Sequence, residues 1–114
     1  MAEQWVTFSH LGGVELVRLV GEIDMANAAS IGQEISVRTG SARAVVIDLT
    51  GVSFLDSAGV RLLDTLVGEF DQRDTRVRLV VGETGAVRTT LRLCAFREDL
   101  LNTDLEAAAT SVTG

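Results

Sequence analysis

The chain has 114 residues, of which 46% are hydrophobic, and carries a formal net charge of −6. This length suits one folded domain, and the apolar content excludes a disordered chain. The acidic balance argues against direct nucleic-acid binding, and the absence of an apolar run of roughly 20 residues argues against a membrane-spanning helix.

The N-terminal part predicts an antiparallel β-hairpin at one edge of a sheet. The first strand is expected over 5–11, Gly12-Gly13 forms the turn, and the second strand follows over 14–20. The residues of the second strand expected to face inward are Val14, Leu16 and Val20.

A first helix is predicted over 25–38, with Asp24 as its N-cap and Gly40 after its C-terminal end. Its apolar face is expected to consist of Ala28, Ile31 and Ile35.

The segment 44–49 is apolar almost throughout, which is typical of a parallel strand covered on both faces. A helix is predicted from Ser57 to about Phe70. Its inward stripe is expected to consist of Val60, Leu63, Val67 and Phe70.

The C-terminal part predicts a short buried strand over 77–81 and a helix from Thr84 or Gly85 to about Leu93. Leu100-Leu101 is expected to form a short last strand. The spacing of Thr103-Asp104-Leu105-Glu106 is that of a capping box and predicts a small C-terminal helix. The tail from about Thr110 is expected to fray.

Strands that alternate with helices favour a mostly parallel sheet with right-handed crossovers. The sequence therefore predicts a single α/β domain over 1–114, with an ordered core over about 4–109. Its four- to five-stranded mixed sheet is expected to have 44–49 near the centre and helices packed against it.

The segment Gly51–Gly59 places a serine beside a carboxylate where the predicted strand 44–49 gives way to a helix. Open α/β sheets carry their functional groups at such junctions. Ser57 is also a good helix N-cap, and Asp56 adds a negative charge at the positive end of the helix dipole. Capping alone is therefore a sufficient explanation of these two residues.

Few side chains are available for catalysis. The only histidine, His10, is expected in the polar turn after the first strand, far from Ser57, and Gly-x-Ser-x-Gly is absent, which argues against a serine hydrolase. One cysteine and one histidine cannot form a zinc site, and the lack of lysine excludes P-loop chemistry. No cofactor and no enzymatic activity are expected.

Cys94 is the only cysteine, so no internal disulfide can form and a reducing compartment is expected. It falls on an apolar helical pattern, and we interpret it as a small core residue rather than a nucleophile. The acidic, polar N-terminus does not resemble a signal peptide, and the predicted location is the cytoplasm.

The strand 44–49 and the segment Val52–Val60 together resemble the STAS domain, and most of all the bacterial anti-sigma factor antagonists (anti-anti-sigma factors). Gly21-Glu22-Ile23-Asp24 is similar to the family's Gly-Glu-Leu-Asp before the first helix. Arg78–Val81, followed by a helix that contains Val87-Arg88, also matches in kind. The sequence departs from the family at Cys94-Ala95-Phe96, where Thr-Gly-Leu is common.

This resemblance implies a phosphorylation switch. Ser57 would be phosphorylated by an anti-sigma factor that is also a serine kinase, and a serine phosphatase would reverse the reaction. The unphosphorylated protein would bind that partner and release a sigma factor. The residues that the resemblance implies for partner binding are Asp24, Asp56, Ser57, Ala58, Gly59 and Arg61.

Two alternatives remain open from the sequence. Other STAS domains are subunits of lipid-transport complexes or scaffolds of stress-signalling assemblies without a kinase switch. Within the switch hypothesis, Ser53 or Thr50 could be a secondary phosphorylation site. The oligomeric state is not predicted.

Overall fold

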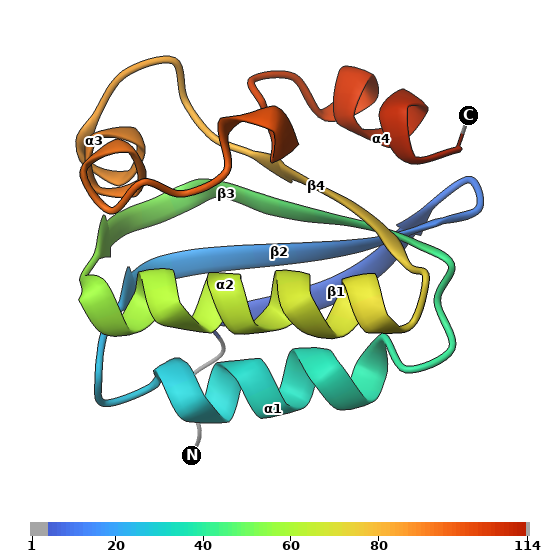
Figure 1. The fold of residues 1–114 in the computed structure, drawn as a ribbon, viewed down its shortest axis with the longest axis horizontal. Coiled ribbons are helices and arrows are strands. Elements are labelled where there is room, and N and C mark those ends of the chain that lie inside the picture. Colours follow the sequence, from blue (N-terminus) through green and yellow to red (C-terminus); the bar gives the residue numbers. More distant parts are fainter. Residues whose placement is uncertain (1–4, 114) are drawn as a thin grey trace.

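A five-stranded mixed β-sheet with helices on both faces forms the centre of the computed structural model, which describes residues 5–113 (Figure 1). The strand order is β1-β2-β3-β4-β5, and only the β1–β2 pair is antiparallel. The predicted mixed α/β sheet is therefore confirmed. The elements are β1 (Val6–Leu11), β2 (Val14–Ile23), α1 (Ala28–Arg38), β3 (Ala44–Leu55), α2 (Ser57–Gln72), β4 (Arg76–Val80), α3 (Ala86–Leu93), the 3-10 turn η1 (Glu98–Leu100), β5 (Leu101–Asn102) and α4 (Leu105–Thr113).

Residues 44–49 of the central strand β3 are buried on both faces, as their apolar run predicts. Val45 and Ile47 belong to the large core that includes the inner faces of α1 and α2. Val46 faces the opposite way, into a smaller core closed by Ala108 and Val112 of α4. Figure 1 shows α1 and α2 side by side and α4 on the other side of the sheet.

Strand β3 is longer than predicted, because it continues past Leu49 to Leu55. Its pairing with β2 extends through Gly51, opposite Val20, to Leu55, opposite Ile23, with register shifts on the way. A Cβ at Gly51 would lie 2.8 Å from Val20 Cγ1, so glycine permits this close pairing. Most of the segment Gly51–Gly59 is therefore strand and not loop.

The predicted β1–β2 hairpin is present, with β1 beginning at Val6. His10 lies within β1 and not in the turn, with Nε2 3.2 Å from Glu15 Oε1 across the hairpin. Val14 and Leu16 are buried as predicted, but Val20 is 37% exposed. Val20 lies on the same face of β2 as Val14 and Leu16, but the small core under α4 that buries those two residues does not include it, so the inward prediction for Val20 was wrong.

Helix α1 begins at Ala28, three residues later than predicted, and Asn27 is its N-cap. Asp24 binds the preceding turn instead: its Oδ1 accepts a hydrogen bond from Ala26 N, and its backbone N–H donates to Asn27 Oδ1, both at 2.9 Å. The helix ends at Arg38 as predicted, with Thr39 as its C-cap and Gly40 directly after. The predicted inner face is buried at Ala28, Ile31 and Ile35.

Helix α2 runs two residues past the predicted end, to Gln72. The predicted inward stripe is confirmed, since all four members are at most 8% exposed: Val60, Leu63, Val67 and Phe70. This packing fixes α2, and therefore the residues at its N-terminus, against the sheet.

The C-terminal elements differ from the prediction mainly at their ends. Strand β4 runs over 76–80 instead of 77–81, and β5 is one residue later than expected. Helix α3 begins at Ala86, after Gly85. At α4, Asp104 Oδ2 accepts the hydrogen bond from Ala107 N (2.9 Å), in place of the expected Thr103 cap, and the helix continues to Thr113 without fraying from Thr110.

Cys94 is exposed, which contradicts its predicted place in the core. Helix α3 ends at Leu93, and the chain turns at Ala95, whose φ is 58°. Leu91 and Phe96 occupy the core positions on either side of this turn. The apolar spacing of α3 therefore does not continue to Cys94, and it did not predict the position of this side chain.

Candidate functional site

Strand β3 and helix α2 meet at a single residue, Asp56. Its backbone N–H donates a hydrogen bond to Ile23 O (3.3 Å), which ties the junction to the end of β2. Its Oδ1 accepts a hydrogen bond from Gly59 N (3.0 Å), so Asp56 is the N-cap of α2. The prediction that Ser57 caps the helix was wrong, although both residue types are good caps.

Ser57 is the first residue of α2 and is exposed. Within residues 5–113, its hydroxyl makes no hydrogen bond, because the cap is already supplied by Asp56. The hydroxyl is therefore accessible to a reagent or a partner without loss of a helix contact.

Gly59 allows the first turn of α2 to approach the sheet. It is buried, and a Cβ there would lie 2.5 Å from Leu55 Cδ1 and 3.1 Å from Ile23 O. A larger residue would push the turn that carries Ser57 away from the strands. Among the six residues predicted to bind a partner, Gly59 thus lies beneath the surface.

The other predicted residues meet at one edge of the sheet. Asp24 follows Ile23 and Asp56 follows Leu55, and these two preceding residues are register partners in the parallel strands β2 and β3. Asp24, Asp56 and Ala58 are half-buried, while Ser57 and Arg61 are exposed. Arg61 lies one helical turn after Ser57, on the same side of α2.

Two exposed apolar side chains next to this edge were not predicted. Met25, in the turn after Asp24, is 82% exposed, and Phe54, near the end of β3, is 48% exposed. An apolar residue in a turn where polar residues are usual was the available signal for Met25. Phe54 gave no signal, because the sequence placed it in a loop.

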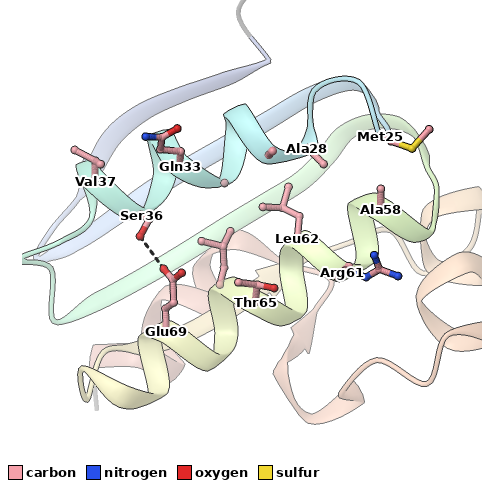
Figure 2. A pocket seen from close by; sticks show the side chains of 13 residues that line it. Met25, Ala28, Gln33, Ser36, Val37, Ala58, Arg61, Leu62, Thr65 and Glu69 are labelled. Atoms are coloured by element: carbon pink, nitrogen blue, oxygen red, sulfur yellow. Dashed lines mark hydrogen bonds between the residues drawn. The ribbon is translucent and has the colours of Figure 1, made fainter.

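A groove between α1 and α2 opens beside the same site (Figure 2). Ala58 and Arg61 line one end of it, and Ser36 and Glu69 line the other. Its existence depends on how two helices pack, so no local sequence pattern predicts it.

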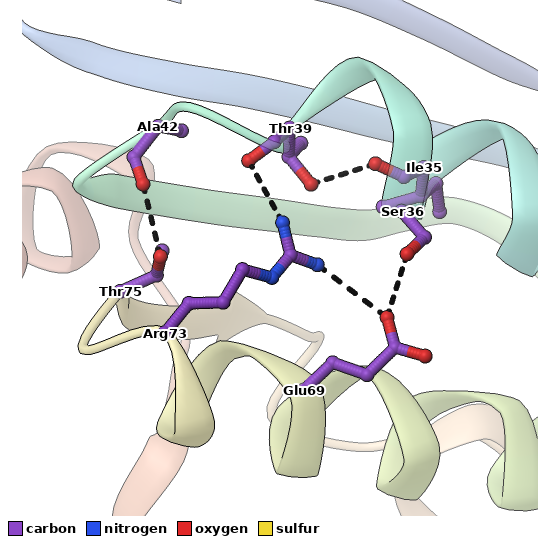
Figure 3. Close-up of polar contacts among 7 residues, drawn as sticks. All are labelled: Ile35, Ser36, Thr39, Ala42, Glu69, Arg73 and Thr75. Carbon is purple, nitrogen blue, oxygen red and sulfur yellow. Dashed lines mark hydrogen bonds and ion pairs between the residues drawn. The ribbon is translucent and has the colours of Figure 1, made fainter.

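Polar contacts join α1 and α2 at the far end of the groove (Figure 3). Ser36 Oγ donates a hydrogen bond to Glu69 Oε1 (2.7 Å), and Arg73 Nη2 lies 3.4 Å from the same oxygen. Arg73 Nη1 also donates to Thr39 O (3.3 Å), beyond the C-terminus of α1. These contacts fix the spacing of the two helices.

The described part of the chain contains no cluster of three or more His, Cys, Asp and Glu residues that could hold a metal ion. Among residues 5–113, no helix has both the length and the hydropathy needed to cross a bilayer.

Three comparisons relate this chain to known proteins. The STAS domain family model matches residues 6–109. A 59-residue stretch is 39% identical to the anti-sigma-F factor antagonist RsfB of Mycobacterium tuberculosis, which is 51% of this chain and 48% of that protein. The match thus spans about half the length of this curated relative.

Two solved structures are similar over nearly the whole chain. The crystal structure of an anti-sigma factor antagonist from Mycobacterium paratuberculosis is 30% identical with a TM-score of 0.86, and the match covers 96% of this chain and 93% of that one. The unphosphorylated form of the anti-sigma factor antagonist SpoIIAA is 21% identical with a TM-score of 0.79, with 96% of each chain covered. At this lower identity the second likeness concerns the fold alone.

Proposed function

Because the chain belongs to the STAS domain family, we propose that it is an anti-sigma factor antagonist that is switched off by phosphorylation of Ser57. In its unphosphorylated form it binds an anti-sigma factor that is also a serine kinase, and a sigma factor is released. A serine phosphatase restores the unphosphorylated form. The protein acts in the cytoplasm as a binding protein, without catalytic activity of its own.

The observation that carries this proposal is the division of roles between Asp56 and Ser57. Asp56 caps α2 through Gly59 N, so the exposed Ser57 hydroxyl has no part in holding the helix. Phosphorylation of Ser57 therefore breaks no contact of the fold among the described residues. A switch residue needs this property, because its modification must alter binding while the domain stays folded.

The charge of a phosphate explains why binding would suffer more than folding. It adds about −1.5 to −2 charges at the N-terminus of α2, where the helix dipole stabilises an anion by up to about 2 kcal/mol. Repulsion from the Asp56 carboxylate opposes this by a similar amount near a surface. In a protein interface the phosphate must also lose water, and a mispaired buried charge costs about 2–5 kcal/mol.

The edge of the sheet around Ser57 has the mixed character of an interface. The exposed apolar side chains Met25 and Phe54 lie in the same segments as the predicted binding residues Asp24 and Asp56. Interface centres combine apolar contacts with few charges, and polar groups surround them. We assign partner binding to these residues together with Ser57, Ala58 and Arg61.

Titration calorimetry with the cognate anti-sigma factor tests the proposal. The wild-type chain is expected to bind and to displace the sigma factor from its complex with the anti-sigma factor. Ser57→Asp should weaken binding at least about tenfold, which corresponds to about 1.4 kcal/mol. Ser53→Asp is the matched control, since Ser53 is also exposed but lies within β3. Wild-type affinity in Ser57→Asp would refute the role of this position.

A further inference from the structure

The groove between α1 and α2 has an apolar floor and two different ends. Its volume is about 520 Å3, which lies within the range of about 300–1,000 Å3 found for small-molecule sites. Four buried or half-buried lining residues from the two helices form the floor: Ala28, Gly32, Leu62 and Leu66. The exposed side chains of Met25 and Val37 extend the apolar surface at the rim.

The end next to Ser57 carries the one cationic side chain among the residues that line the groove. Arg61 lines it, and within residues 5–113 its guanidinium has no ion pair and no hydrogen bond to a side chain or carbonyl group. Helices α1 and α2 run parallel (Figure 1), so the positive ends of both helix dipoles point the same way, and neither helix has an acidic residue in its first turn. Asp24 and Asp56 lie near this end but do not line the groove, and each carboxylate accepts a backbone N–H.

The opposite end offers no site for an anion. Glu69 lines it and is already bound by Ser36 Oγ at 2.7 Å and Arg73 Nη2 at 3.4 Å. An anionic group placed here would meet a carboxylate whose partners are taken. The charges therefore set one orientation for an amphiphilic ligand.

We propose that the groove binds a free long-chain carboxylate, with the alkyl chain along the floor and the carboxylate at Arg61. Glu69 lies eight positions after Arg61 on α2, so the helix rise of about 1.5 Å per residue makes the groove about 12 Å long between them. An extended alkyl chain fits such a groove.

The two helices approach each other closely at the floor of the groove. A Cβ at Gly32 would lie 2.5 Å from Leu62 Cδ1. Only glycine at this position of α1 leaves room for the Leu62 side chain of α2. The alkyl chain would lie over this contact and shield the apolar atoms of the groove floor from solvent. This site does not depend on phosphorylation of Ser57, and the two proposals can fail separately.

A titration of the 15N-labelled full chain, followed by its amide resonances, tests the proposal. The probe is dodecanoate below its micelle concentration, and dodecyltrimethylammonium supplies the same chain with the opposite charge. Dodecanoate should cause saturable shifts at residues such as Ala29, Gly32 and Thr65, and the cationic probe should bind at least about threefold more weakly. No saturable shift, shifts centred elsewhere, or equal binding of the two probes would overturn the proposal.

Variants separate the head group from the chain. Arg61→Gln should weaken dodecanoate binding at least about threefold, while Arg92→Gln, at an exposed arginine of α3 that does not line the groove, should have no effect. Ala29→Phe fills the groove from α1 and Thr65→Phe fills it from α2, and both positions are exposed, so the fold should tolerate them. A folded filling variant that keeps wild-type affinity would overturn the assignment of the site.

Discussion

The Asp56 carboxylate accepts a hydrogen bond of 3.0 Å from the Gly59 backbone N–H, and this contact defines the start of α2. The neighbouring Ser57 hydroxyl is left exposed and outside the cap. Two adjacent residues that could each cap a helix thus have separate places: Asp56 is half-buried in the cap, and Ser57 is exposed on the surface. Substitutions of Asp56 should therefore change the stability of the fold, whereas substitutions of Ser57 should change it little.

Asp56→Ala should lower the free energy of unfolding by about 0.5–2 kcal/mol, because it removes an N-cap. Ser57→Ala should change it by less than about 0.5 kcal/mol, the range of ordinary surface substitutions. Denaturant melts of the two variants measure both values. A larger loss in Ser57→Ala than in Asp56→Ala would mean that serine, not aspartate, caps α2 in solution.

Asp56→Asn tests the charge of the cap without removing the cap. Asparagine caps helices about as well as aspartate does, so stability should fall by no more than about 1 kcal/mol, the contribution of one charge at a helix start. If the carboxylate helps a kinase to position the Ser57 hydroxyl, phosphorylation should slow by far more than this change explains. A variant phosphorylated at the wild-type rate would leave Asp56 a purely structural residue.

Two glycines of α2 should respond in opposite directions to alanine. Gly59→Ala should destabilise the protein by about 1–3 kcal/mol, because the new Cβ meets Leu55 Cδ1 and Ile23 O. Gly68→Ala should stabilise it by about 0.5–1 kcal/mol, since nothing lies within 4 Å of its Cβ position. Thermal melts of the pair give the signs, and equal effects would contradict the close packing at Gly59.

Ala95→Gly should raise the free energy of unfolding by about 0.5–1 kcal/mol. Ala95 has a φ of 58°, in the left-handed region that favours glycine. The gain is reduced because glycine is also freer in the unfolded chain. A denaturant melt in which Ala95→Gly is less stable than wild type would show that this backbone conformation is not retained in solution.

The sequence was most informative where burial alone decides the structure. The apolar run 44–49 correctly predicted the central strand, and the spacing of Val60, Leu63, Val67 and Phe70 correctly predicted the inner face of α2. Both patterns record how many faces of an element are covered. Such patterns are independent of the exact ends of the strand or helix.

The ends of elements were less predictable, because several neighbouring residues are equally good caps. Asp56 and Ser57 are both favoured N-caps, and only the hydrogen bond to Gly59 N distinguishes them. At α1 the cap is Asn27, while Asp24 binds the turn before it. The extension of β3 to Leu55 depends on its pairing with β2, and the groove depends on how α1 and α2 pack. No local sequence pattern predicts either feature.

The central claim is most directly tested by mapping the phosphate after incubation of the chain with ATP and its cognate anti-sigma factor kinase. The account predicts one added phosphate by intact mass, located on Ser57 by peptide fragmentation, and none on Ser57→Ala. Ser53→Ala should be phosphorylated like the wild type. A phosphate on Ser53 or Thr50, or a Ser57→Ala variant that still gains one phosphate, would contradict the account.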